Sequence, residues 1–324
     1  RLATGEAKTN GNTNVWKDEL GNVTNVERLV NVDYQNIESK DNLISITTGS
    51  LDKDGKAIEG NLTNNVLAGI YAEGKKSTVI ANDGLQIQVE NNIASPVGIY
   101  AGNGGSATFT STSGDLNIIT KTMDGGNTLT NAIWLDPSKN GGESITITAG
   151  NTNLTMEGGY GGNGIAIQKT DRWGENSKES TKGGTITIKG DLNIKGKDNE
   201  TWGIGANPTN VLSRFNNAGI LVDVNNSEVK VTGNVDMDVY GNGVTVIGEN
   251  STVTIAKGGS ITVPTGTNYG YYALAAYDKG TINMNANGDA NTVKLDGDIF
   301  ATKGSTINLG LVTTDSYLNG IIDN

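Results

Sequence analysis

Cysteine and histidine are both absent from this 324-residue sequence. Without cysteine, the chain has no disulfides, thiolate metal ligands or thiol nucleophiles. Without histidine, it lacks the commonest general base and the commonest transition-metal ligand. We therefore expect no catalytic residues, no metal site, no cofactor and no enzymatic activity. A cysteine-free chain also suits a polypeptide that crosses a narrow pore unfolded.

Aromatic residues make up only 5% of the chain, and there are only 4 prolines. Glycine, by contrast, is abundant, with 46 residues. A large compact core normally depends on Phe, Trp and Tyr, each of which buries a large area. The buried side chains must here be Val, Ile, Leu and Ala in many small clusters. Disordered chains share this composition, but the apolar residues of this sequence are periodic, which argues against disorder.

Positive charge is also in short supply, with 24 basic against 35 acidic residues and a net charge of −11. Nucleic acids and anionic membranes are bound chiefly by Lys and Arg, so neither is an expected partner. No apolar run approaches the roughly 20 residues that span a bilayer, so we expect no direct membrane insertion. The acidic charge is expected to keep an exposed surface soluble.

Short segments with alternating polar and apolar residues recur along the chain. This period of two predicts β-strands that are buried on one side. Examples are SITIT at 144–148, TITIK at 185–189, EVKVT at 228–232 and TVTIA at 252–256. A second strand follows each of these, as in DLNI at 191–194, and a glycine-led strand precedes each pair, as in GIAI at 164–167. The glycine-led strands place successive units about 24 to 30 residues apart, with wider gaps at insertions, at Gly69, Gly98, Ala132, Gly164, Gly219, Gly243, Ala273 and Asp298.

Three short strands in each tandem unit predict an all-β fold, a right-handed single-stranded parallel β-helix (β-solenoid) with loop insertions. Residues 1–42 are expected to form irregular coils or a partial cap, and residues 43–324 the β-helix rod. Charged or aromatic interruptions predict loop insertions at about 168–182 and 196–217. A β-sandwich is the alternative, because Asn-Gly hairpin dipeptides also occur.

Two of these units, NSTVTIAKGGSITV at 250–263 and GDIFATKGSTINL at 297–309, resemble the passenger domains of monomeric type V autotransporters of Gram-negative bacteria. The resemblance extends from about residue 66 to about residue 310. It implies an adhesin or self-associating segment, located at the cell surface or extracellular and anchored through an outer-membrane barrel that is not present in this chain. The Gly-Asp-Ser-Gly motif of the family's serine proteases is missing.

The partners that this resemblance implies are a host surface protein or glycan, or another copy of the same chain. Aromatic residues among polar ones are the candidate contacts, because aromatic rings stack on sugars and anchor protein interfaces. Each of them can instead anchor a loop or fill the interior. The candidates for ligand or interface contact are Trp134, Asp136, Asp171, Arg172, Trp173, Glu175, Trp202, Tyr271 and Tyr272.

Two other functions stay open. A polysaccharide lyase or hydrolase on the same scaffold would use acidic residues such as Asp136, Asp171 with Arg172, or the pair Asp236 and Asp238, but a solvated face is the better explanation of that pair. A passive stalk would present only a smooth surface. The acidic segment at 52–59 lacks the full spacing of a calcium loop and predicts a charged turn.

Overall fold

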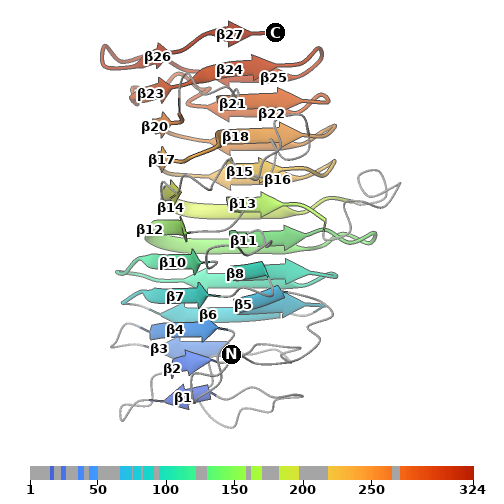
Figure 1. The fold of residues 1–324 in the computed structure, drawn as a ribbon, viewed down its shortest axis with the longest axis vertical. Helices are drawn as coiled ribbons and strands as arrows, with labels where there is room; N and C mark the ends of the chain where they lie inside the picture. Colours follow the sequence, from blue (N-terminus) through green and yellow to red (C-terminus); the bar gives the residue numbers. More distant parts are fainter. Residues whose placement is uncertain are drawn as a thin grey trace.

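The computed structural model describes residues 15–17, 23–26, 36–39, 44–49, 66–74, 76–81, 83–90, 95–121, 130–157, 162–169, 182–196, 218–264 and 271–324. Within these ranges the regular structure consists of strands, and no helix occurs. The strands lie across the long axis of the molecule and follow one another along it in sequence order (Figure 1). The expectation of an all-β chain built on parallel strands is confirmed.

Three parallel ladders organise the strands, and each strand pairs with its counterpart in the neighbouring repeats. The first ladder contains β3 (Asn36–Ser39), β6 (Lys76–Ala81), β9 (Ser106–Thr110), β12 (Ser144–Glu157), β14 (Thr185–Gly196), β16 (Glu228–Val231), β19 (Thr252–Ile255), β22 (Thr281–Met284) and β25 (Thr306–Leu309). The second contains β4 (Ile44–Gly49), β7 (Leu85–Glu90), β10 (Leu116–Lys121), β12, β14, β17 (Val235–Asp238), β20 (Gly259–Thr262), β23 (Val293–Asp296) and β26 (Tyr317–Asn319). Because β12 and β14 belong to both ladders, these two form a single 16-stranded sheet.

The third ladder is a separate 9-stranded sheet. It contains β5 (Val66–Glu73), β8 (Ser95–Gly102), β11 (Thr130–Asp136), β13 (Gly162–Ile167), β15 (Ala218–Val222), β18 (Asn242–Ile247), β21 (Tyr272–Tyr277), β24 (Asp298–Ala301) and β27 (Ile322–Asp323). Near the N-terminus, β1 (Val15–Lys17) and β2 (Val23–Val26) pair antiparallel in a sheet of their own. The parallel ladders begin at β3 and β4.

The glycine-led series predicted from the sequence lies in one column of the third ladder. The register places Gly98 beside Ala132, Gly164 beside Gly219, and Gly243 beside Ala273. The alignment of Asp298 with Ala273 was wrong, because Asp298 pairs with Tyr272 and the register shifts before Leu274. A bulge that inserts one residue accounts for this shift.

The glycines of this column are required by the narrow space between the third and second ladders. A Cβ at Gly164 would lie 2.8 Å from Ile194 Cγ2 and 2.7 Å from the Gly219 carbonyl oxygen. A Cβ at Gly219 would lie 2.9 Å from Met237 Sδ. These distances are shorter than ordinary van der Waals contacts, so a side chain here forces its neighbours apart.

The core is a column of Ile, Val, Leu and Ala that runs through the repeats. Strands of the first two ladders alternate between buried and partly exposed residues, as in β14, where Ile188 and Ile194 are fully buried. The third ladder differs, since β13 and β18 are buried at every position. An inward residue is fully covered only where a repeat lies on both sides of it, and Ile307 and Leu309 in the last repeat are partly buried.

A stacked turn precedes the first-ladder strand in each of the repeats from β6 to β25. Each turn places a residue in the left-handed region two positions before the strand's first outward side chain, and this favours glycine and asparagine. The residues and their φ values are Gly74 (67°), Gly104 (79°), Gly142 (96°), Gly183 (76°), Asn226 (58°), Asn250 (57°), Lys279 (66°) and Gly304 (86°). In three of the turns the preceding residue (Asn103, Gly141 or Asp278) also has a positive φ. This corner ladder accounts for part of the unusual glycine and asparagine content.

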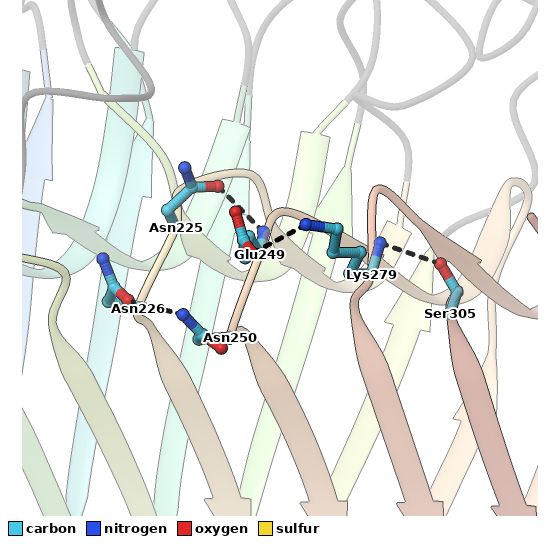
Figure 2. Close-up of polar contacts among 6 residues, drawn as sticks. All are labelled: Asn225, Asn226, Glu249, Asn250, Lys279 and Ser305. Atoms are coloured by element: carbon cyan, nitrogen blue, oxygen red, sulfur yellow. Dashed lines mark hydrogen bonds and ion pairs between the residues drawn. The ribbon is translucent and has the colours of Figure 1, made fainter. Parts of the chain in front are cut away.

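Hydrogen bonds join neighbouring turns of the corner ladder (Figure 2). The Asn225 side-chain oxygen accepts a 2.9 Å bond from the Glu249 backbone N–H, and Asn250 Nδ2 donates to Asn226 Oδ1 at 3.3 Å. Further along, the Lys279 backbone N–H donates to a serine hydroxyl in the next turn, and Lys279 Nζ forms an ion pair with Glu249 Oε1 at 2.7 Å. The turns before β16, β19, β22 and β25 are therefore tied to one another by side chains as well as by the strands.

Candidate functional site

Trp134 lies in an aromatic column on the outer face of the third ladder. Its ring meets Tyr100 edge-on, with centroids 5.4 Å apart, and Tyr100 stacks on Tyr71 of the preceding repeat at 5.0 Å. Trp134 is only 7% exposed, and its Nε1 donates a 2.8 Å hydrogen bond to the Gln168 carbonyl oxygen. Asp136 accepts a long hydrogen bond of 3.4 Å from the Tyr100 hydroxyl. This geometry favours the anchoring interpretation of Trp134 over direct ligand contact.

The adjacent residues Tyr271 and Tyr272 have different environments. Tyr271 is 5% exposed and packs in the main core. Tyr272 is partly exposed and stacks on Phe300, with centroids 5.1 Å apart, and Tyr277 contacts the same ring at 5.2 Å. We call Tyr272, Tyr277 and Phe300 the aromatic patch. The structure therefore separates the tyrosine cluster into a core residue and a partly exposed group on the outer face of β21 and β24.

Five of the other candidates lie outside the described residues: Asp171, Arg172, Trp173, Glu175 and Trp202. The predicted insertions at about 168–182 and 196–217 lie almost entirely outside them as well, and so does the acidic segment at 52–59. Their roles stay predictions.

One pair of carboxylates that the sequence offered for catalysis, Asp236 and Asp238, points to solvent. Asp236 and Asp238 are exposed on β17, where the alternating residues Val235 and Met237 are buried. In the described ranges, no group of three or more acidic side chains comes together in a way that would hold a metal ion. The described ranges likewise contain no helix with the length and hydropathy of a bilayer-spanning segment.

One buried carboxylate has a structural explanation. Glu143 is 2% exposed, and its Oε1 accepts hydrogen bonds from the Gly104 backbone N–H at 2.7 Å and the Ser138 backbone N–H at 2.9 Å. Hydrogen bonds from backbone N–H groups stabilise a buried carboxylate. Glu143 therefore joins the turn before β9 to the turn after β11.

An asparagine ladder follows the outward positions of the second ladder. Asn153 donates to Asn117 at 2.8 Å, and Asn193 donates to Asn153 at 2.7 Å. Near the C-terminus the same ladder carries Tyr317, whose hydroxyl donates a 2.8 Å hydrogen bond to Asp296. This hydrogen bond, assisted by partial desolvation and by the negative charge of Asp296, raises the pKa of Tyr317 above 10.0.

The most regular surface lies on the outward positions of the first ladder from β9 to β25. Two columns of side chains run across seven strands, and we call them together the hydroxyl face. The first column is Ser106, Ser144, Thr185, Glu228, Thr252, Thr281 and Thr306, and the second is Thr108, Thr146, Thr187, Lys230, Thr254, Asn283 and Asn308. Ten of these fourteen residues are serine or threonine. Every residue of the face is partly or fully exposed.

The comparisons with known proteins give no relationship for this chain. No family model, no curated protein and no solved structure matches it. Its function must therefore be argued from the geometry of its own surface.

None of the residues of the hydroxyl face was among the candidate contacts, although the sequence contained a signal for them. The candidates were aromatic residues and charged residues close to them. Aligning the alternating strands at 144–148, 185–189 and 252–256 would have placed Ser or Thr above Thr at the first two outward positions of each strand. A uniform column of short polar side chains on successive strands indicates a flat surface.

Proposed function

We propose that this chain is an adhesin segment of a bacterial cell surface, exposed or secreted, and that its repeats form a right-handed parallel β-helix. The single observation that carries the proposal is the length and regularity of its lateral surface. Three ladders of parallel strands continue through the repeats, and the first presents an array of mostly short polar side chains across seven strands. Such a surface suits many weak contacts that add along its length.

The proposed partners are a host surface protein or glycan, or another copy of the chain, with the outcome of attachment or of aggregation and biofilm formation. The aromatic patch supports the first possibility, because partly exposed rings stack on sugar rings and anchor protein contacts. The hydroxyl face supports the second. The proposal contains no catalytic step and requires no cofactor.

The direct test is to couple the purified chain to beads and to measure three readouts in parallel. These are binding to an array of glycans, binding to immobilised host surface proteins, and clumping of the beads themselves. Beads that carry the heat-denatured chain are the control. Adhesion predicts a signal above the control in at least one readout, whereas a stalk predicts a signal in none. Shortening of an acidic polysaccharide during the assay would identify the lyase or hydrolase instead.

Within this proposal, the aromatic patch has a specific test. Replacing Tyr272 and Phe300 with serine removes the stacked rings from the outer face, where each ring is partly exposed. Glycan or host-protein binding should then fall while bead clumping is unchanged. Serine at Trp134 is the matched comparison, because that ring is buried, and its replacement should lower stability before it lowers binding.

A further inference from the structure

We infer that the hydroxyl face is a self-recognition surface on which a second copy of this chain packs side by side with both molecules pointing in the same direction. The inference rests on the proposed function and deepens it, because it names the partner, the surface and the orientation. It depends on the placement of two charges in an otherwise uncharged array.

The hydroxyl face contains one acidic and one basic residue, and both lie on its central strand. Glu228 is in the first column and Lys230 is in the second, on β16. Within the two columns, the three strands on one side of β16 (β9, β12 and β14) and the three on the other (β19, β22 and β25) contribute only uncharged residues. Among the described residues, neither charge has an ion-pair partner within the chain. Both are therefore available to a partner.

The uncharged strands suit close packing of two identical surfaces. Serine, threonine and asparagine are short, so they lose little side-chain entropy when they are covered, and their hydroxyl and amide groups both donate and accept hydrogen bonds. Adjacent strands of a sheet are about 4.8 Å apart, so the columns of two copies have the same spacing and stay in register. The surface is thus complementary to itself.

The two charges select between the two symmetric ways of packing this face on itself. A two-fold axis parallel to the long axis of the molecule places each strand opposite the same strand of the second copy and exchanges the two columns. Glu228 then faces Lys230 of the second copy, and Lys230 faces Glu228. A two-fold axis parallel to the strands and centred on β16 keeps the columns, so that Glu228 faces Glu228 and Lys230 faces Lys230.

Only the first arrangement is attractive, and its two molecules point in the same direction. Sliding the copies by one to three strands in the opposite-direction arrangement removes the repulsion but leaves both charges against uncharged groups. Lys76 of β6, which continues the first column, would reach Glu228 only after a slide of four strands, and that slide leaves β22 and β25 without a described first-ladder strand opposite them.

The flanking charges are compatible with the same-direction arrangement. Lys189 would lie opposite Gly183 of the second copy, and Lys279 opposite Asn285. Charge complementarity of this kind sets the register and orientation of an interface.

Charge variants of the full chain test the attraction by sedimentation equilibrium. Glu228→Lys and Lys230→Glu each place like charges opposite one another, and each should weaken self-association about tenfold or more. The double variant Glu228→Lys/Lys230→Glu restores complementarity and should recover the wild-type value. Mixing the two single variants should give heterodimers. Raising the salt concentration from about 0.1 M to about 1 M shortens the Debye length from about 10 Å to about 3 Å and should weaken the wild-type complex.

Thiol cross-linking tests the orientation of the two copies. Because the natural sequence has no cysteine, only the introduced thiols can react. Thr146→Cys on β12 should react with itself through a short thiol–thiol cross-linker, since the same-direction arrangement brings β12 opposite β12. Thr146→Cys mixed with Thr281→Cys on β22 should give no heterotypic product, because four strand spacings of about 4.8 Å separate them. Circular dichroism of every variant confirms that it is folded.

The outcomes separate this inference from the proposed function. A wild-type chain that stays monomeric yet binds a glycan or host protein overturns the inference and leaves adhesion standing. Self-association together with the heterotypic cross-link would refute the same-direction orientation. Self-association that is unchanged in all charge variants would refute the hydroxyl face as the contact surface. Recovery in the double variant together with the homotypic cross-link supports both. If the wild-type chain is monomeric and the single charge variants abolish its binding to a glycan or host protein, the hydroxyl face binds a partner of another kind. That result also overturns the inference.

Discussion

The corner ladder offers a matched pair of substitutions that separates the cost of a backbone conformation from the cost of a clash. Gly104 and Gly183 occupy equivalent turns, with nearly equal φ values of 79° and 76°. A Cβ added at Gly104 would meet no atom within 4 Å. A Cβ added at Gly183 would lie 2.9 Å from the Asn225 carbonyl oxygen and even closer to the Asn226 carbonyl group.

The magnitudes follow from these surroundings. Placing alanine in the left-handed region costs about 1–2 kcal/mol, and both substitutions incur this cost. Gly183→Ala adds an overpacking cost of about 1–3 kcal/mol, because the neighbouring atoms are backbone and cannot rotate away. We therefore expect a free energy of unfolding lowered by about 1–2 kcal/mol for Gly104→Ala and by about 2–5 kcal/mol for Gly183→Ala.

Guanidinium unfolding followed by circular dichroism measures the loss in the free energy of global unfolding. Hydrogen exchange at amides near each turn measures the loss in local stability. Both are needed because the stability of a repeat protein is a sum over neighbouring units. Gly142→Ala is a second control, since its φ is 96° and a Cβ there also meets nothing within 4 Å. Equal losses at Gly104 and Gly183, or no loss at Gly104, would refute the reasoning.

Three further predictions concern the interior and the second ladder. Gly164→Ala should lower the free energy of unfolding by about 1–3 kcal/mol, since its Cβ would lie within 2.9 Å of the facing side chain, and the melting temperature measures the loss. Asn153→Ala should cost about 1–3 kcal/mol in chemical unfolding, because it removes two side-chain hydrogen bonds at 2.8 and 2.7 Å. The pKa of Tyr317 is raised in the folded state, so its contribution to stability is complete below pH 10.0 and is lost as the pH rises through the folded-state pKa. Asp296→Ala should lower that pKa in an ultraviolet absorbance titration, and an unchanged titration curve would contradict the assignment.

Much of the strand arrangement was predictable from the spacing of residues, because the first two ladders are covered on one side only. Alternation at 185–189 assigns Ile188 to the interior and Thr187 to the surface, and the structure agrees. The glycine series also gave the correct register from Gly69 to Ala273. The error at Asp298 came from a bulge, which changes the register without leaving a recognisable pattern in the sequence.

The positions of the aromatic candidates were less predictable, because the third ladder is buried on both faces. Alternation loses its meaning when every residue of a strand is covered, as in β13 and β18. Tyr271 and Tyr272 are neighbours of the same type, yet the first packs in the core and the second is partly exposed. Only the three-dimensional packing distinguishes them. The burial of Trp134 likewise depends on contacts with Gln168 and Tyr100, which are more than thirty positions away.

The direction of the strands has a mechanical consequence. Because they lie across the long axis (Figure 1), the hydrogen bonds between repeats run along that axis, and a tensile force loads all bonds of one interface together. The interfaces themselves are in series, so the weakest one yields first and the others stay intact. One short repeat, from Gly219 to Gly243, holds 24 residues (243 − 219). At about 3.3–3.6 Å per residue, its release extends the chain by about 80 Å. Such a molecule under tension would lengthen in discrete steps, and each step would lower the force on the repeats that stay folded.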